Sequence, residues 1–301
     1  MKLRFDVPDR HQADPYILAD DGMYYIYVSG DDGVEAYECE TLEGVWRYKG
    51  VVCSFENCRN FWAPSIIKYE GTYYMYVSCD EGDKWEHMMV MSSDSPLGPF
   101  TNRKELYDRF SIDSHIVQTE AGLFLFYAED NKEGEKIGTR IFVDKMIDPY
   151  TPAHICREIL TPSFPEEMFE SNRYGDGRDW YTLEGAFWFR EGEYQYLIYS
   201  AGCYMNDTYH LGYAVAKSDE TDLTKVDWTK HSADGKFDPL MIKNEYEEGT
   251  GHNSVIKIGE QYYVVYHARD YEKDGNPYWN HRTGRICPMQ VKDGILTLTH
   301  P

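Results

Sequence analysis

Five segments of the chain share one pattern of apolar and polar positions. Each begins with a short apolar run, passes through a polar turn that contains glycine, and returns as a strand rich in aromatic residues. Aromatic and β-branched residues favour strands, and glycine adopts the backbone angles of tight turns at little cost. The pattern therefore predicts five β-hairpins, at residues 11–30, 63–79, 113–130, 184–202 and 251–270.

The spacing of the turn glycines predicts the architecture. Gly22, Gly71, Gly122, Gly192 and Gly259 follow one another at intervals of about 50 residues and later of about 70. A repeat of about 50 residues is typical of a four-stranded propeller blade. We therefore predict an all-β fold, a single five-bladed β-propeller domain over residues 1–301. A long loop is expected at residues 144–179, and a last strand at residues 295–299 is expected to close the ring with the N-terminal segment.

Counting back eight residues from the turn glycines reaches a position that is acidic in three hairpins. It holds Asp14, Asp113 and Glu184, provided that the third turn is one residue longer than the others. The first strand of each blade lines the channel of a propeller, so these acids should meet at one mouth of it, with His252 close by. Carboxyl groups held close together repel one another when both are ionised, so one of them should have a raised pKa and keep its proton. Glycoside hydrolysis needs one ionised and one protonated carboxyl group.

Composition limits the partners. The net charge of −22 argues against nucleic acid and against anionic membranes, whereas aromatic residues at 16% suit surfaces on which sugars stack. The seven scattered cysteines predict free thiols, and Cys53 and Cys58 lack the further ligands of a zinc site. No leader and no membrane-spanning run is seen, so we expect a cytoplasmic protein, with a secreted form that has lost its leader left open.

Five short motifs, one in each hairpin, resemble those of a known family. They are ADP at residues 13–15, WAPS at 62–65, ID at 112–113, EG at 184–185 and GHNS at 251–254. In this order the chain resembles glycoside hydrolase family 43, the five-bladed propeller enzymes that act on arabinose- and xylose-containing glycans. Two departures, Ala186 where the family usually has proline and Ser114-His115 after Asp113, leave the shape of the sugar subsites open.

The resemblance implies the roles of the acids. Asp14 is the expected general base, Glu184 the expected general acid, and Asp113 the residue that raises the pKa of Glu184 and orients it. The family inverts the anomeric carbon, so Asp14 and Glu184 are expected about 6.5–9.5 Å apart, with a water between them and the sugar.

The resemblance also implies binding residues. Phe61 and Trp62 would form an apolar wall for a sugar face, and Arg285 resembles a late arginine that contacts the substrate and the base. His252 resembles a histidine on the channel axis, often close to a calcium or chloride ion, although no cofactor is required. The expected partner is a small oligosaccharide.

The expected reaction is removal of terminal α-L-arabinofuranosyl or β-D-xylosyl residues from plant-derived oligosaccharides. An exo-galactofuranosidase and a non-catalytic glycan-binding propeller stay open as alternatives. Simpler interpretations also exist for single residues. Asp14 could cap a turn, Asp113 could accept backbone hydrogen bonds, Glu184 could be a surface acid, Trp62 could pack between blades and His252 could be a core histidine. The shared position of the acids in the repeat favours catalysis for them.

Overall fold

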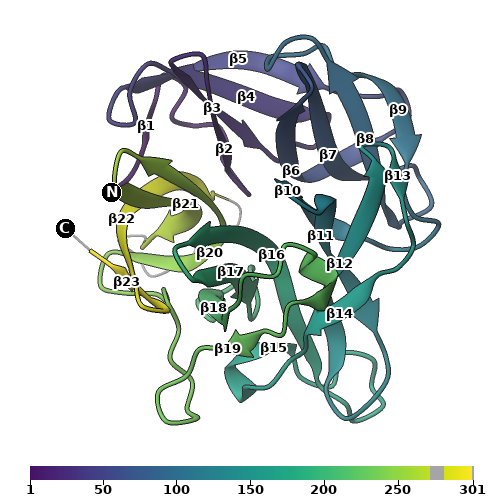
Figure 1. Ribbon diagram of the computed structural model, residues 1–301, viewed down its shortest axis with the longest axis vertical. Coiled ribbons are helices and arrows are strands. Elements are labelled where there is room, and N and C mark those ends of the chain that lie inside the picture. Colours follow the sequence, from purple (N-terminus) through teal and green to yellow (C-terminus); the bar gives the residue numbers. More distant parts are fainter. Residues whose placement is uncertain (272–280, 300–301) are drawn as a thin grey trace.

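The five predicted hairpins form the inner strands of five antiparallel blades arranged in a ring (Figure 1). The computed structural model describes residues 1–271 and 281–299. The first long strands of the blades, β2, β6, β10, β16 and β20, contact one another in turn around the centre. The protein is therefore a five-bladed β-propeller, as the repeat predicts.

The blades follow one another along the chain. Blade 1 contains β1 (Arg4–Phe5), β2 (Tyr16–Asp20), β3 (Met23–Val28), β4 (Val34–Cys39) and β5 (Val45–Cys53). Blade 2 contains β6 (Arg59–Tyr69), β7 (Thr72–Asp80), β8 (Glu86–Ser93) and β9 (Thr101–Glu105). Blade 3 contains β10 (Ile112–Thr119), β11 (Gly122–Asn131), β12 (Ile137–Asp148), β13 (Thr151–Pro152) and β14 (Arg157–Leu160). Blade 4 contains β15 (Met168–Glu170), β16 (Trp180–Glu191), β17 (Tyr194–Ala201), β18 (His210–Lys217) and β19 (Thr229–Lys230). Blade 5 contains β20 (Glu247–Ile258), β21 (Gln261–Asp270), β22 (Thr283–Lys292) and β23 (Ile295–Leu298).

Among the described residues, two short 3-10 helices lie outside the blades, η1 (Pro165–Glu167) and η2 (Leu223–Lys225). The predicted loop at residues 144–179 is only partly a loop, because it includes the end of β12, all of β13, β14 and β15, and η1. In the part of the chain that the structure describes, no helix is long and apolar enough to cross a membrane. All seven cysteines are free, as predicted, and six of them are buried.

The apolar core lies between the blades. Five clusters of buried side chains each join two neighbouring blades around the ring. Between blades 1 and 2, for example, Tyr27 and Val34 pack with Met75 and Val77, all fully buried. Both faces of most inner strands are therefore buried, which explains why strict alternation of polar and apolar residues is weak in the sequence.

Blades 3 and 4 are joined directly into one ten-stranded sheet. The start of β12 pairs in parallel with the start of β16, Ile137–Thr139 against Trp180–Thr182. The close approach requires glycine, because a Cβ atom on Gly138 would lie 1.8 Å from the carbonyl oxygen of Tyr181.

The N-terminal segment closes the ring. Its residues Arg4–Phe5 pair with β5 of blade 1, while Lys2 bridges to Arg285 in β22 of blade 5. The amino group of Met1 donates a 2.8 Å hydrogen bond to the carbonyl oxygen of Ile286. The predicted C-terminal strand exists as β23, but it pairs with β22 inside blade 5.

Candidate active site

A kink at the same place in every blade shapes the centre of the ring. Eight residues before the second residue of each inner hairpin turn, the backbone adopts a left-handed conformation. These residues are Asp14 (φ 53°), Ala63 (φ 48°), Asp113 (φ 60°), Gly185 (φ 60°) and His252 (φ 47°). In blades 2 to 5 the strand register shifts at this point, which is the signature of a β-bulge. Such bulges aim side chains, and here they aim residues at the ring centre.

This finding corrects the alignment of the acids. In blades 1 and 2 the turn glycine is the second turn residue, but Gly192 and Gly259 are the first residues of their turns. Counting back eight residues from those two glycines therefore reaches a residue one position too close to the N-terminus. Asp14 and Asp113 occupy the shared position, whereas Glu184 precedes it, and the equivalent residues of blades 4 and 5 are Gly185 and His252.

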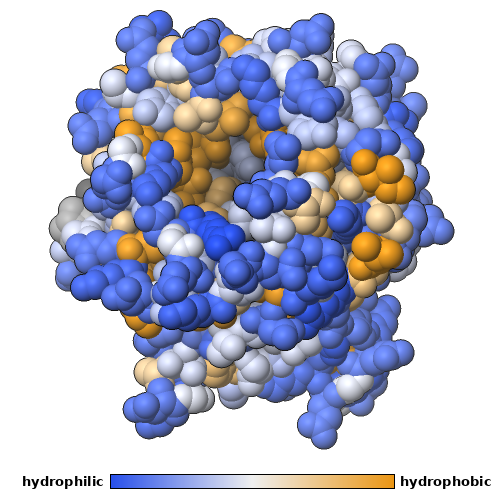
Figure 2. Space-filling model, viewed as in Figure 1, coloured by the Kyte–Doolittle hydropathy of each residue, from blue (hydrophilic) through white to orange (hydrophobic). Residues whose placement is uncertain are grey.

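The predicted acids nevertheless line one cavity of about 360 Å³, together with Trp62 and His252. Figure 2 shows the molecule hollowed near the middle of the ring. Aromatic side chains from blades 2 to 4 and their connecting loops surround the acids: Trp62, Trp85, Phe110, Phe169, Tyr174, Trp180 and Tyr204. A concave site that combines aromatic walls with a few convergent charges is typical of a ligand-binding pocket.

Asp14 is held ionised by its neighbours. Its backbone N–H donates to Nδ1 of His267 at 3.1 Å, and the Ser29 hydroxyl donates to its Oδ2 at 2.5 Å. The Arg282 guanidinium lies 3.2 Å from its Oδ1. Burial alone would raise the pKa of Asp14, but the Arg282 charge, assisted by His252 and His267, holds that pKa well below its ordinary value.

Asp113 and Glu184 have the opposite tendency. Burial, and next the Glu184 charge, raises the pKa of Asp113 well above its ordinary value, although the carboxylate accepts a 3.1 Å hydrogen bond from the N–H of Gly185. Burial also raises the pKa of Glu184 to about 7, against a hydrogen bond from Tyr209 that lowers it. The cavity thus combines one ionised carboxylate with a pair that retains a proton near neutral pH.

Trp62 and Phe61 have different environments. Trp62 lines the cavity with 38% of its surface exposed, so a sugar ring can reach it. Phe61 is fully buried and packs against Phe55, 5.5 Å between ring centroids, so it does not offer a wall to a ligand. In a strand, neighbouring side chains point to opposite faces, which separates these two residues.

The predicted arginine contact falls on a different residue. Arg285 lies within β22, and its guanidinium donates to Glu247 at 2.8 Å and to Asp270 at 2.6 Å, outside the cavity lining. Arg282, just before β22 begins, carries the contact with Asp14 instead. Sequence reasoning also missed His267, Tyr209 and Ser29, which lie in no recognisable motif.

The surroundings of His252 bear on the axial ion. Its Nδ1 lies 3.5 Å from Asp14 and 3.9 Å from Asp113, and burial lowers its pKa. A cavity of about 10 Å³, lined by Asp14, His252 and Asn253 among others, is large enough for one water. Both amide atoms of Asn253 have no partner in the described chain. Asn253 offers one amide oxygen and His252 one ring nitrogen, while the oxygens of Asp14, which also lines this cavity, are already paired with Ser29 and Arg282. This set is poor in the free oxygen ligands that calcium prefers, so no step is assigned to an ion.

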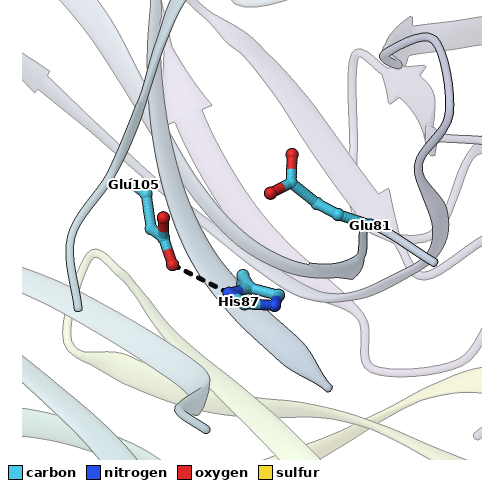
Figure 3. Close-up of side chains that lie close together, drawn as sticks. All are labelled: Glu81, His87 and Glu105. Carbon is cyan, nitrogen blue, oxygen red and sulfur yellow. Dashed lines mark hydrogen bonds and ion pairs between the residues drawn. The ribbon is translucent and has the colours of Figure 1, made fainter. Parts of the chain in front are cut away.

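Another group of acidic and histidine side chains lies near the edge of blade 2. Glu81, His87 and Glu105 are close enough to hold an ion (Figure 3). Their ligand atoms are already engaged, because His87 contacts Glu105 at 2.8 Å and Asp83 at 3.0 Å, and Arg103 donates to Glu81 at 2.8 Å. These contacts outweigh burial and raise the pKa of His87, which favours the imidazolium that cannot bind a metal. The group is best described as a surface ion-pair network.

The sequence and the fold resemble those of known glycoside hydrolases. The profile described as Glycosyl hydrolases family 43 matches residues 7–296. A crystal structure of a thermostable family-43 glycoside hydrolase is 29% identical, with a TM-score of 0.80 over 96% of this chain and 93% of that one. The α-L-arabinofuranosidase from Lactobacillus brevis is 21% identical, with a TM-score of 0.79 over 96% and 94%. The endo-1,4-beta-xylanase from Bacteroides thetaiotaomicron is 22% identical, with a TM-score of 0.78 over the same shares. Curated proteins give no match.

Proposed function

The chain belongs to glycosyl hydrolases family 43, and on this premise we propose that it removes terminal α-L-arabinofuranosyl or β-D-xylosyl residues from short oligosaccharides. Enzymes of this family hydrolyse glycosidic bonds with inversion and need no cofactor. One structural neighbour, 18% identical, is a β-xylosidase/α-arabinofuranosidase in complex with xylotriose, which supports both the substrate class and the pair of sugars.

The observation that carries the proposal is the meeting of three acids in one cavity with unlike surroundings, since Arg282 lies against Asp14 whereas Asp113 and Glu184 have no arginine or lysine partner among the described residues. In our proposal Asp14 stays ionised and takes a proton from a water that attacks the anomeric carbon. Glu184 keeps its proton near neutral pH and gives it to the departing glycosidic oxygen. Asp113 orients the donor, because it holds the Gly185 peptide next to Glu184 through its 3.1 Å hydrogen bond. The pKa of Glu184 is raised by burial and next by the Asp14 charge, whereas the pKa of Asp113 is itself raised well above its ordinary value. These are the two carboxyl roles of an inverting glycosidase.

The walls of the cavity support action on chain ends. The segment between β14 and β16 contributes Phe169, Arg173 and Tyr174 to one side, with the Arg173 guanidinium 4.8 Å above the Phe169 ring. This segment is anchored by Glu167, which is fully buried and accepts hydrogen bonds from the N–H groups of Ser163 and Phe164. We infer that this wall limits the length of glycan that fits beside the acids, which is our basis for proposing action on chain ends.

Replacement of the proton donor tests the proposal. Glu184→Ala should lose activity on arabino- or xylo-oligosaccharides by about 10²- to 10⁴-fold, because the departing hydroxyl needs a proton. On a nitrophenyl glycoside, whose leaving group departs without one, the loss should be much smaller. Glu191→Ala, on the same strand but ion-paired to Lys257 outside the cavity, is the matched control and should keep full activity. Equal losses on both substrates would reject Glu184 as the acid.

The identity of the sugar requires a side-by-side assay. Nitrophenyl α-L-arabinofuranoside, β-D-xyloside and β-D-galactofuranoside differ in ring size and hydroxyl positions, so relative kcat/KM values identify the terminal residue. Proton magnetic resonance of the first-formed anomer tests inversion in the same experiment. Glycan binding without turnover of any of the three would instead favour a non-catalytic propeller.

A further inference from the structure

Tyr209 makes a hydrogen bond that the proposed chemistry does not yet use. It lies immediately before β18 and is 1% exposed, and its hydroxyl donates to Oε1 of Glu184 at 2.7 Å. A buried tyrosine hydroxyl needs a partner, and here that partner is the proposed proton donor. Among the described residues no hydrogen bond to Oε2 of Glu184 is found, so Oε2 is the oxygen left for a ligand in the cavity.

Two contacts fix the Tyr209 ring. It stacks on His267 with 5.7 Å between centroids and 11° between planes, and His267 also accepts the N–H of Asp14 through Nδ1. The preceding loop is held by Arg269, whose guanidinium donates to the carbonyl oxygens of Tyr204 at 2.6 Å and Asn206 at 2.9 Å. The hydroxyl is thus presented by a rigid support that also touches the proposed base.

Gly251 supplies the space for this ring. A Cβ atom at Gly251 would lie 1.9 Å from Cε1 and 2.3 Å from Cδ1 of Tyr209, far inside van der Waals contact. The backbone of Gly251 is not left-handed, so the position does not need glycine for its conformation. The first residue of the GHNS motif is therefore explained by the room that Tyr209 needs beside Glu184.

Resting on the proposed function, we propose that Tyr209 is a positioning residue for the proton donor. Its hydroxyl holds Oε1 of Glu184 as the acceptor, so the transferable proton is carried by Oε2 on the cavity side. During cleavage the Oε2–H bond breaks, the glycosidic oxygen takes the proton, and Tyr209 keeps its own. The hydrogen bond from Tyr209 strengthens as negative charge develops on the carboxylate, because bonds to charged acceptors are stronger.

The effect on pH dependence must be considered with all groups around Glu184. Burial raises its pKa, the Tyr209 bond and the Arg282 charge lower it, and the Asp14 charge raises it. The titratable and charged groups facing the site, taken by element, are Asp14 before β2, Lys84 before β8, Asp113 on β10, Asp130 on β11, Arg173 and Tyr174 before β16, Cys203 and Tyr204 after β17, Tyr209 before β18, His252 on β20, His267 on β21 and Arg282 before β22. Removal of the Tyr209 hydroxyl leaves all the others in place, so it should move only the limb that Glu184 controls.

The test is Tyr209→Phe, which keeps the ring and its stack. The basic limb of the kcat/KM profile should move about one pH unit higher, since a contribution that lowers the pKa of Glu184 is lost. On oligosaccharides kcat should fall about tenfold, and on a nitrophenyl glycoside much less. Gly251→Ala, which pushes the ring away, should show the same alkaline shift. Tyr266→Phe is the matched control, because its hydroxyl donates at 2.8 Å to buried Glu247 outside the cavity, and its basic limb should stay in place.

The outcomes separate this inference from the proposed function. An unchanged basic limb in Tyr209→Phe, with Glu184→Ala still selectively impaired on oligosaccharides, would overturn the role of Tyr209 alone. A shift of equal size in Tyr266→Phe would overturn it as well. If Glu184→Ala lost activity equally on both substrates, the proposed acid itself would fail, whatever the tyrosine variants showed.

Discussion

Replacement of Arg282 by glutamine tests what keeps the proposed base ionised. The guanidinium lies 3.2 Å from Oδ1 of Asp14, and its side chain is only 17% exposed. With an effective dielectric constant of about 20, Coulomb's law gives an attraction of about 5 kcal/mol at this distance. Burial of Asp14 and the two histidines beside it reduce the net effect, and charges this close shift a carboxyl pKa by about 1–3 units.

The sign of the effect follows from the role of the base. Asp14 must be ionised to act, so activity falls when the pH drops through its pKa. Arg282→Gln removes the charge that holds this pKa down, and the acid limb of the kcat/KM profile should move up by about 1–3 pH units. The same charge lowers the pKa of Glu184, so the basic limb should also move up. Displacement of the whole profile distinguishes this variant from Tyr209→Phe, which should move only one limb.

The assay is a pH profile of kcat/KM on a nitrophenyl glycoside, with Arg285→Gln as the matched control. Arg285 lies three residues further along the chain and is also held in ion pairs, with a side chain that is 6% exposed, but its partners are Glu247 and Asp270. Its replacement should lower stability and leave both limbs in place. The reasoning is refuted if Arg282→Gln keeps the acid limb of the unmodified protein, or if Arg285→Gln moves that limb equally.

Two predictions concern stability. Glu86 is buried and its pKa is raised from 4.5 to about 8 by burial, with the Asp80 charge second. The free energy of unfolding should therefore fall as the pH rises from about 4.5 to about 8, and this fall should be absent in Glu86→Gln. Urea unfolding at several pH values measures it, and an equal fall in the variant and the unmodified protein would contradict the prediction. Lys230 pairs at 2.6 Å with fully buried Glu167, so Lys230→Ala should lower the free energy of unfolding by about 3 kcal/mol. Lys217→Ala, at an exposed pair with Glu193, should leave the free energy of unfolding almost unchanged, and similar losses in both variants would show that burial does not matter.

The regular repeat of hairpins in the sequence was sufficient to predict the fold and most residues of the candidate site. Periodic hairpins fix which residues face the channel, so Asp14, Asp113 and His252 could be located without coordinates. Glu184 was found despite an alignment one residue in error, because in every blade either the residue at the left-handed position or the one before it lines the cavity. The error arose because a glycine can occupy either residue of a two-residue turn, and the sequence does not say which.

Other parts of the site could not be predicted from the sequence. Arg282 and Arg285 are three residues apart, and only the start of β22 at Thr283 decides that Arg285 lies inside the sheet, opposite Tyr266. Phe61 and Trp62 are adjacent aromatic residues of β6. Their side chains point to opposite faces of the strand, and the sequence does not say which face lines the cavity. Tyr209 lies in no motif. The glycine at position 251 is an indirect sign of it, because the backbone there does not require glycine and a larger side chain would collide with the Tyr209 ring.

The join between blades 3 and 4 has a consequence for how the site responds to motion. Asp113 on β10 and Glu184 on β16 are carried by one continuous ten-stranded sheet, whereas Asp14 precedes a strand of a separate sheet. Main-chain hydrogen bonds within one sheet therefore link the two groups that share a proton. Asp14 is tied to them across separate sheets, through the contacts of Arg282 and the histidines and through a few main-chain bonds from blade 1 to its neighbours, such as Gly30–Phe61 and Gln12–Arg282. If the blades move relative to one another, Asp113 and Glu184 should move together. The distance that changes should be the one between this pair and Asp14, on the two sides of the sugar, where a water must enter.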